Sequence, residues 1–369
     1  MMTLFDEFTL GNITLSNRFV RSATWEGMCD DRGVPTEKLA SLYEELAKGG
    51  VGLIITGYAY VREDGKGNPF QMGLYDDALV PHLKELVSRV HALGGKIVAQ
   101  IVHAGGQGKE SVSGMRTIAP SAISFPSYPE VPGEMTGKDI EDVIGAFGEA
   151  AVRSVRCGFD GVQIHGAHGF LISQFLSPLT NKRKDEFGGS LENRSRFLME
   201  VLRRVREGVG KDFPVLIKIN ADDFLTGGFS FGDLIRLAKM LEDEGLDGME
   251  VSGGTPASGD RNPARIGILG IEEEAYHREY ASILKSQVRF PIILVGGLRS
   301  PALLEEILLS GDADLFSLSR PFIREPGLVS RWSSGDLTKA KCISCNGCFL
   351  PGMQEGGIYC IVEKREREA

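Results

Sequence analysis

Short runs of apolar residues alternate along the chain with stretches that carry apolar side chains at helical spacing. The runs are rich in Val, Ile and Leu and are apolar throughout, as expected of parallel strands covered on both faces. The intervening stretches, such as 36–50 and 77–95, end in glycine, which commonly terminates helices. We predict strands at 19–23, 52–57, 96–103, 161–167, 214–221, 248–254, 291–298 and 314–320.

Eight strands that alternate with helices predict an α/β fold, a closed (β/α)8 TIM barrel. A barrel takes about 250 residues, so the 369 residues leave room for long loops and an appendage. An open doubly wound sheet is the alternative, but polar residues at nearly every strand end favour closure. We expect the barrel over 1–335 and a Cys-rich C-terminal extension over 336–369. Residues 4–18 predict an N-terminal hairpin, and 104–138 predict a long functional loop such as a lid.

Composition narrows the class of partner. The formal net charge of −9 leaves no basic excess for a nucleic-acid backbone and disfavours an anionic membrane surface. The chain starts without a basic, then apolar, leader, and no run of 18 apolar residues occurs. Cysteines gather near the C-terminus instead of spreading as a disulfide framework. We therefore expect a cytoplasmic protein with a small-molecule substrate, no membrane and no nucleic acid.

Active sites of (β/α)8 barrels lie at the C-terminal ends of the strands. Polar side chains and glycines occupy those positions here, and they combine hydroxyl, amide, imidazole and cationic groups. We expect one cavity formed by Ser22, Ala23, Thr24, Tyr58, Gln100, His103, His165, His168, Lys218, Ser252, Gly254, Gly296, Gly297, Ser319 and Arg320.

The last two strand ends predict a phosphate site. Gly296 and Gly297 allow a ligand to approach the backbone closely, and N–H groups at a nearby helix start suit a dianion. Arg320, after the last strand, can add bidentate contacts. A tight turn and a surface ion pair are the alternative interpretation. The occurrence of both features at adjacent strand ends favours the phosphate.

The middle strand ends suit a flavin ring. Gln100 can bind the pyrimidine edge as donor and acceptor, and Lys218 can stabilise negative charge on the reduced ring. His165 and His168 can donate hydrogen bonds to a substrate oxygen. The pair is also a candidate zinc ligand set, but no neighbouring carboxylate or cysteine completes such a site.

Four longer motifs stand out: 17–20 (NRFV), 99–105 (AQIVHAG), 165–171 (HGAHGFL), and 174–194, which contains QFLSP, NKR, DEFGGS and ENR. Together they resemble the Old Yellow Enzyme family of NADH:flavin oxidoreductases. The resemblance implies a barrel that binds FMN and uses NAD(P)H as co-substrate. It implies that Gln100, Lys218, Gly297 and Arg320 contact FMN, and that His165 and His168 bind the activating oxygen of the substrate.

The sequence departs from the family at two positions. Phe170 stands where ene-reductases of the family usually carry the tyrosine that donates a proton, and Lys218 replaces the common arginine. We expect a substrate site formed by Trp25, His103, His165, His168 and Phe170. Trp25 and Tyr58 either form an aromatic pocket or pack within the barrel.

Cys342, Cys345, Cys348 and Cys360 form a C-x2-C-x2-C-x11-C motif. Such spacing can bind a [4Fe-4S] cluster, and the motif resembles the corresponding segment of trimethylamine dehydrogenase and 2,4-dienoyl-CoA reductase. Four cysteines can also bind zinc, and a metal-free segment is a third interpretation. No Rossmann fingerprint occurs, so we expect no second flavin or nicotinamide domain. Cys29 and Cys157 are interpreted as packing thiols.

These patterns predict an FMN-dependent NAD(P)H oxidoreductase that reduces the activated C=C bond of an α,β-unsaturated carbonyl compound. One alternative is an FMN/iron–sulfur electron-transfer subunit that works with a partner protein. Another is an amine dehydrogenase or demethylase, with Tyr58 in a cage for a cation. The sequence leaves open the physiological substrate, the choice between NADH and NADPH, and whether the chain is a monomer or a homo-oligomer.

Overall fold

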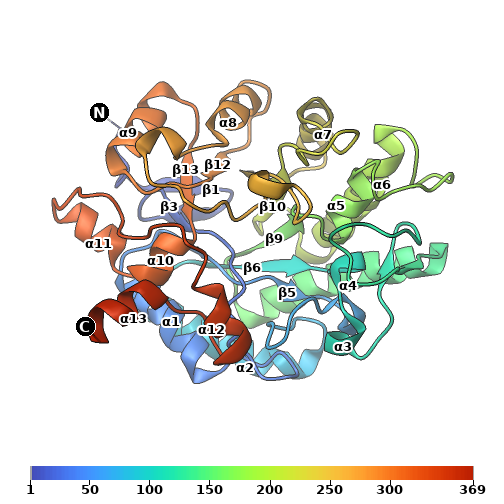
Figure 1. The fold of residues 1–369 in the computed structure, drawn as a ribbon, viewed down its shortest axis with the longest axis horizontal. Coiled ribbons are helices and arrows are strands. Elements are labelled where there is room, and N and C mark those ends of the chain that lie inside the picture. The colour runs from blue at the N-terminus through green and yellow to red at the C-terminus, as the bar shows by residue number, and fades with distance from the viewer. Residues whose placement is uncertain (1, 369) are drawn as a thin grey trace.

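Eight parallel strands form a closed barrel in the computed structural model, which describes residues 2–368 (Figure 1). The strands are β3 (Phe19–Arg21), β4 (Leu53–Ile55), β6 (Ile97–Val102), β9 (Gly161–Gly166), β10 (Val215–Asn220), β11 (Gly248–Ser252), β12 (Ile292–Val295) and β13 (Leu315–Leu318). Each pairs with its neighbours in chain order, and β13 pairs with β3 to close the ring. Each also lies inside its predicted range, so the predicted (β/α)8 fold is confirmed.

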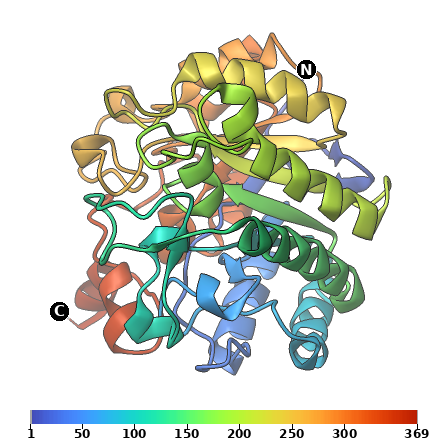
Figure 2. The same cartoon turned by 90° about the vertical axis from the view of Figure 1, so that its right-hand side faces the viewer.

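Amphipathic helices surround the barrel and bury their apolar stripes against it. They are α1 (Glu37–Lys48), α2 (Val80–His91), α4 (Gly137–Cys157), α6 (Leu191–Val209), α7 (Phe231–Asp243), α8 (Arg278–Lys285), α9 (Pro301–Ser310) and α11 (Leu328–Ser333). Helix α1 shows the pattern, because Leu39, Tyr43 and Leu46 recur at helical spacing and are buried. The long helices α4 and α6 lie side by side on the outside (Figure 2).

Shorter elements complete the chain. They are β1 (Phe8–Leu10), β2 (Ile13–Leu15), β5 (Ala59–Tyr60), β7 (Ile118–Ala119), β8 (Gly133–Glu134), α3 (Glu110–Ser113), α5 (Leu171–Leu176), α10 (Arg320–Arg324), α12 (Phe349–Gln354) and α13 (Ile361–Glu368). Strands β1 and β2 pair antiparallel and confirm the predicted N-terminal hairpin. Among residues 2–368, no helix combines the length and the hydropathy needed to cross a bilayer.

The barrel interior changes from apolar to polar along its axis. Leu10 and Leu15 of the hairpin are fully buried in one cluster with Leu216 and Leu315 of the strands. Side chains two positions apart on a strand face the same side. The next inward positions after Leu216 and Leu315 are therefore those of Lys218 and Ser317, which are polar. The barrel thus has an apolar floor and a polar upper layer at the C-terminal ends of its strands.

The C-terminal segment packs against the barrel beside α1, where Figure 1 shows α12 and α13 in red. The Lys38 ammonium on α1 donates to the Gly356 carbonyl at 3.0 Å, and Ile358 N–H donates to the Glu26 carbonyl at 2.9 Å. Closer to the strand ends, Ala340 N–H donates to the Arg299 carbonyl at 2.9 Å. The extension therefore covers part of the barrel mouth.

Candidate active site

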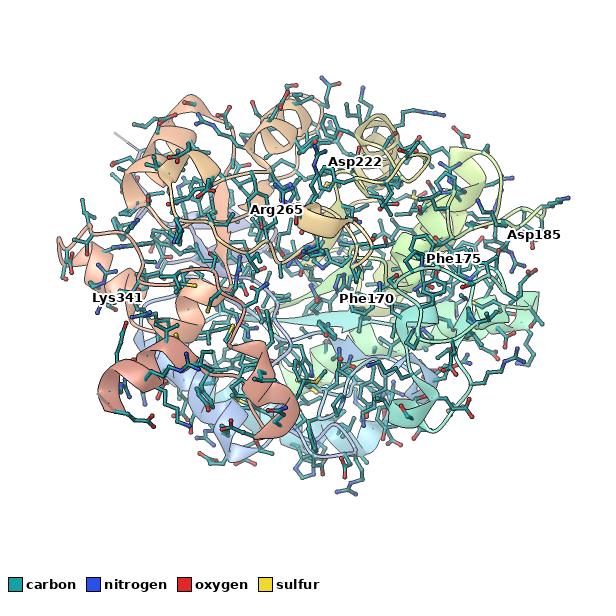
Figure 3. The ribbon with its side chains drawn as sticks, viewed as in Figure 1. Phe170, Phe175, Asp185, Asp222, Arg265 and Lys341 are labelled. Carbon is teal, nitrogen blue, oxygen red and sulfur yellow. The ribbon has the colours of Figure 1, made fainter. Side chains whose placement is uncertain are left out.

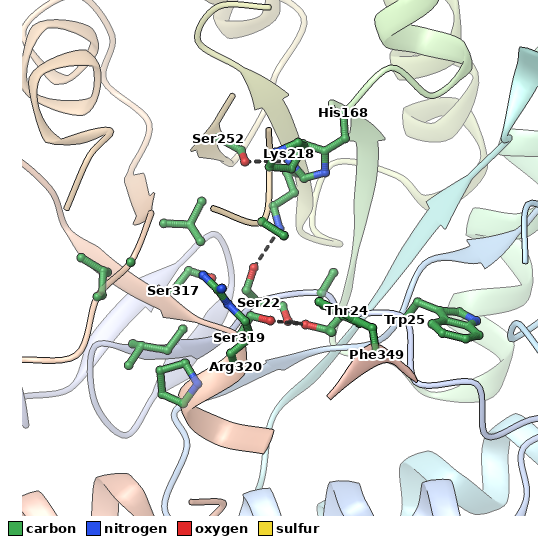
Figure 4. A pocket seen from close by; sticks show the side chains of 18 of the residues that line it. Ser22, Thr24, Trp25, His168, Lys218, Ser252, Ser317, Ser319, Arg320 and Phe349 are labelled. Atoms are coloured by element: carbon green, nitrogen blue, oxygen red, sulfur yellow. Dashed lines mark hydrogen bonds between the residues drawn. The ribbon is translucent and has the colours of Figure 1, made fainter. Parts of the chain in front are cut away.

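A cavity of about 390 Å³ lies at the C-terminal ends of the strands (Figure 4). Many of the residues predicted from the strand ends line it, namely Ser22, Ala23, Thr24, Trp25, Tyr58, His168, Phe170, Lys218, Ser252, Gly297, Ser319 and Arg320. Because these residues come from seven different strands or strand ends, barrel closure is what assembles the cavity.

Four other predicted residues are buried beside the cavity wall without lining it. Gln100 lies in the barrel interior, where its Nε2 donates to Gln163 Oε1 at 2.6 Å. The His165 ring contacts the Phe170 ring, with centroids 4.8 Å apart. Gly254 and Gly296 have positive φ angles and form turns.

His103 does not reach the cavity wall. Its imidazole is fully buried, lies 3.2 Å from Asp64, and accepts a hydrogen bond from Gly105 N–H at 3.1 Å. The structure thus gives His103 a role in holding the loop after β6, although the sequence suggested substrate binding. The position of a residue at a strand end does not determine the direction of its side chain.

Lys218 belongs to a buried polar network. Its ammonium donates to Ser22 Oγ at 2.8 Å and lies 3.1 Å from Glu250 Oε1. Glu250 also accepts hydrogen bonds from Ser22, Ser317 and Gln163 at 2.7–2.9 Å. Burial raises the pKa of Glu250, but Lys218 and these hydrogen bonds outweigh burial, so the net pKa is lowered. The network fixes one cation at the cavity wall.

The His165 and His168 rings meet edge to face, with centroids 5.2 Å apart. Burial, and then the Lys218 charge, lower the pKa of His165 well below its usual value. Burial also lowers the pKa of His168, with further effects of His165, Lys218 and His277. Both imidazoles are therefore neutral near pH 7.

Hydrogen bonds determine which ring nitrogen of each histidine is free. His165 Nδ1 accepts from Ala167 N–H at 3.3 Å, so the proton of the neutral ring lies on Nε2. His168 Nε2 is 2.7 Å from Ser252 Oγ (Figure 4), and the His168 backbone has a φ of 62°. Such strain at a non-glycine residue is typical of functional sites.

An aromatic wall stands next to the histidines. Phe170, on the loop after β9 (Figure 3), has its ring centroid 5.3 Å from that of Tyr58. The Tyr58 hydroxyl accepts a hydrogen bond from Asn68 Nδ2 at 2.7 Å. Trp25 donates from Nε1 to the Pro69 carbonyl at 3.2 Å. These contacts favour the interpretation of Trp25 and Tyr58 as parts of an aromatic pocket.

The opposite end of the cavity offers donors for an anion. The N–H groups of Gly297 and Ser319 have no acceptor among residues 2–368. Arg320 lines the cavity and is held by the Arg265 carbonyl and by Asn346 Oδ1, at 2.7 and 2.6 Å. We expected N–H groups at a helix start to help bind the phosphate. Those of Arg299 and Ser300, just before α9, are not available, because they donate to the Glu274 carboxylate.

These features fit FMN. Gln100 Oε1 is buried and has no partner among the described residues, as expected of an acceptor reserved for a ligand. Arg299 also lines the cavity, and its Nε and Nη2 are buried without a hydrogen-bond partner, although Nη2 lies 3.9 Å from Glu274 Oε1. Gly297 has a φ of 70°, and a Cβ there would lie 3.0 Å from the Tyr276 ring. The unpartnered N–H groups and Arg320 thus suit a phosphate, and Gln100 and Lys218 suit the edge of a flavin ring.

The four C-terminal cysteines surround a small void of their own. Cys342, Cys345, Cys348 and Cys360 line it together with Arg320, which also lines the main cavity. Ser344 and Asn346, between the first three cysteines, have φ angles of 55° and 58°. Within residues 2–368, no three His, Cys, Asp or Glu side chains converge on a point where a single metal ion would bind. The cluster predicted from the spacing stays a prediction.

Several residues that line the cavity or support its wall were missed at the level of sequence. Glu250 and Gln163 lie inside strands, two positions before Ser252 and His165, and this register was an available signal. Phe349 and Met353 line the cavity from the C-terminal segment. No local pattern predicts them, because their contact with the barrel is formed only by the tertiary fold.

The long loop over 104–138 supports the site from behind. Gln107 donates to the His168 carbonyl at 2.7 Å, and Gly106 N–H donates to Gln174 Oε1 at 3.0 Å. No described residue of the loop lines the cavity. The loop therefore holds the strained turn at His168 and does not form the lid expected from its length.

Comparisons with known proteins agree with this geometry. Residues 3–338 match the model of the NADH:flavin oxidoreductase / NADH oxidase family. The chain is 37% identical over 352 residues to the NADH oxidase of Thermoanaerobacter brockii, a match that covers 94% of this chain and 53% of that protein. The chain thus spans about half the length of this curated relative.

Solved structures of related proteins share the fold of this chain. The structure of 2-naphthoyl-CoA reductase with 2-naphthoyl-CoA superposes with a TM-score of 0.90 at 31% identity, over 98% of this chain and 56% of that one. The old yellow enzyme homologue of Zymomonas mobilis superposes with a TM-score of 0.78 at 29% identity, over 92% and 94% of the two chains.

Proposed function

The chain belongs to the NADH:flavin oxidoreductase / NADH oxidase family, as its motifs predict, and we propose that it is an FMN-dependent NAD(P)H oxidoreductase that reduces the activated C=C bond of an α,β-unsaturated carbonyl compound. The observation that carries this proposal is the pair of neutral, buried imidazoles beside a cavity that also presents a fixed cation. Such a cavity suits an uncharged acceptor that is activated by hydrogen bonds.

The two ends of the cavity would hold FMN. Gly297 and Ser319 would donate N–H groups to the phosphate, and Arg320 would add a guanidinium. Beside the wall at the other end, the buried Gln100 would bind the pyrimidine edge, and Lys218 would lie next to it. When bound, FMN carries two electrons from NAD(P)H to the acceptor as a hydride equivalent.

The histidine pair would hold the acceptor. His165 presents Nε2–H, and His168 presents Nδ1–H when the Ser252 hydroxyl donates to its Nε2. Hydrogen bonds from both rings to a carbonyl oxygen withdraw electrons from the conjugated C=C bond and activate its β-carbon. Their burial excludes water, so these bonds act in a medium of low dielectric.

The test is an anaerobic half-reaction. We expect cyclohexenone to reoxidise the reduced flavin of the holoenzyme, and His165→Ala to slow this step about 100-fold, as for the loss of one oxyanion donor. His82→Ala, an exposed position on α2, is the matched control and retains the full rate. The proposal is wrong if no enone reoxidises the wild-type flavin.

A second candidate function, electron transfer to a partner protein, is favoured by one observation. Arg320 lines both the main cavity and the void among the four cysteines, so the two sites are adjacent. The cysteines would hold a [4Fe-4S] cluster, which supplies single-electron transfer when bound. Strain at Ser344 and Asn346 supports a backbone shaped around a bound group.

Iron and acid-labile sulfide in anaerobically purified protein test this function. We expect about four of each per chain, and a Cys348→Ala variant with a strongly reduced content. Cys157→Ala, at the end of α4, is the control and keeps the wild-type content. Zinc in place of iron, or metal-free protein that is fully active, would contradict an electron relay.

A further inference from the structure

The aromatic wall contains one proton donor that faces the ligand space. Phe170 has no exchangeable proton, but the Tyr58 ring lies against it, with centroids 5.3 Å apart, and 6.0 Å from the His165 ring. Tyr58 follows β4 and lines the cavity, where its ring meets that of Phe170 on the loop after β9. A phenol therefore stands next to the groups that would hold the acceptor.

The hydrogen bonds of Tyr58 leave its own proton free. Asn68 Nδ2 is a donor, so the Tyr58 hydroxyl accepts this bond at 2.7 Å. The hydroxyl donates to no residue within 2–368, and both side chains line the cavity. The O–H bond is thus available to a bound acceptor.

A small network sets the position of this pair. Gln71 Oε1 accepts the N–H groups of Gly67 and Asn68 at 2.8 and 3.1 Å. Gln71 Nε2 donates to the Tyr58 carbonyl at 2.9 Å. One buried glutamine therefore ties the backbone of Tyr58 to the loop that carries Asn68. Such support keeps a reacting group at a fixed distance from its substrate.

We propose that Tyr58 is the catalytic residue that donates a proton to the α-carbon of the acceptor, and that Asn68 is a positioning residue for its hydroxyl. This inference rests on the function proposed above. Asn68 would stabilise the phenolate that forms after the transfer, because its N–H bond strengthens as negative charge develops. Burial raises the pKa of Tyr58, and the Asn68 bond offsets part of that rise. The phenol therefore stays protonated at neutral pH.

The step balances as a two-electron reduction. The π bond of the acceptor breaks, and its β-carbon gains a hydride equivalent that derives from NAD(P)H. The α-carbon gains the proton of Tyr58, and the phenolate recovers a proton from solvent. The net reaction consumes the acceptor, NAD(P)H and one proton, and it yields the saturated product and NAD(P)+.

Tyr276 is the other tyrosine that lines the cavity, and its surroundings suit a different role. Its ring lies under the Arg265 guanidinium, 4.0 Å from the centroid, at the end where Gly297 lies. That is the end assigned to the phosphate, and Tyr276 has no ring contact with His165 or Phe170 among the described residues. Tyr58 is thus the better placed donor.

The experiment measures reoxidation of dithionite-reduced holoenzyme by two acceptors. Cyclohexenone requires a proton on carbon, whereas ferricyanide requires none. For Tyr58→Phe we expect the cyclohexenone rate to fall at least 100-fold and the ferricyanide rate to stay within about twofold. Asn68→Ala should lower the cyclohexenone rate less, about tenfold. Tyr60→Phe is the control, because its hydroxyl bonds the Arg32 carbonyl outside the cavity.

A rescue variant separates chemistry from structure. Phe170→Tyr places a phenol on the ring that contacts Tyr58. The double variant Tyr58→Phe/Phe170→Tyr should therefore react with cyclohexenone at least tenfold faster than Tyr58→Phe alone. An unchanged cyclohexenone rate in Tyr58→Phe overturns the inference but leaves the proposed function intact. Equal losses with both acceptors also overturn it, since they indicate a structural role. Failure of the wild type to react with any enone removes the proposed function itself.

Discussion

The barrel interior and the C-terminal segment both contribute to the cavity, but they are held in different ways. In the barrel, Glu250 alone has four partners from four other strands or strand ends. In the segment, Asn346 makes one bond to the Ala264 carbonyl at 2.6 Å and receives one from Arg320, and its backbone is strained. The polar centre of the barrel is therefore held by redundant contacts, whereas the turn at Asn346 in the segment depends on two.

The largest expected effect is that of pH on the stability of the barrel. Three imidazoles of the barrel, those of His165, His168 and His277, are buried with lowered pKa values, and that of His277 falls to about 3. Below about pH 6.5, the pKa of histidine in an unfolded chain, the unfolded chain binds protons that the folded chain does not. The free energy of unfolding therefore decreases as the pH is lowered. The cost is about 1.4 kcal/mol for each group per pH unit.

Between pH 7.5 and 5.5 we expect the apoprotein to lose roughly 4 kcal/mol of unfolding free energy, measured by urea denaturation. His277→Gln removes one of the three groups and should reduce the loss by about a third. Residues 336–368 contain no histidine, so acid should not loosen that segment first. Equal stability at the two pH values would show that the imidazoles titrate normally.

Breaking the buried pair of the barrel is the next largest effect. Lys218→Met leaves the Glu250 carboxylate buried without its cation and should destabilise the apoprotein by about 3 kcal/mol. Lys138→Met removes an exposed pair with Asp142 and is the control, with no measurable effect expected. Urea denaturation at pH 7.5 measures both. Similar effects of the two variants would mean that Lys218 does not compensate Glu250.

The two regions also differ in what their sequence predicts. The strands were predictable because buried parallel strands are apolar throughout, and their order follows from alternation with helices. Barrel closure then brings the strand ends together, so residues as distant as Ser22 and Arg320 could be assigned to one cavity. The direction of an individual side chain was not predictable, as His103 shows by turning to Asp64.

The sequence of the C-terminal segment contains a recognisable motif, but it does not indicate where the segment packs on the barrel. The spacing of its cysteines predicts that they share a site, and they do line one void. Nothing in that spacing indicates that α12 packs on Trp25, where a Cβ at Gly352 would lie 2.8 Å from the indole ring. Contacts between segments more than 300 residues apart depend on the finished barrel surface, not on local propensity.

A smaller effect should separate the segment from the barrel. Asn346→Ala removes two hydrogen bonds and keeps a side chain at a positive φ, so we expect a local loss of about 2 kcal/mol. Asn346→Gly removes the same bonds but relieves the strain, and should cost about 1 kcal/mol less. Hydrogen exchange should accelerate in 336–368 and stay unchanged in β9 and β10. Faster exchange throughout the barrel would show that the two regions unfold as one unit.

The smallest effect concerns the part of the cavity that the segment supplies. Met353 lines the cavity on α12, so Met353→Ala should weaken the binding of a bulky enone by about 1 kcal/mol, or about fivefold in KM, with kcat unchanged. Leu350 lies on the same helix, is 56% exposed and does not line the cavity, which makes Leu350→Ala the matched control. Steady-state kinetics with a bulky enone and with cyclohexenone should show the difference only for the bulky one. Equal KM values in both variants would mean that the barrel alone forms the acceptor site, because the wall contributed by α12 would then have no contact with the substrate.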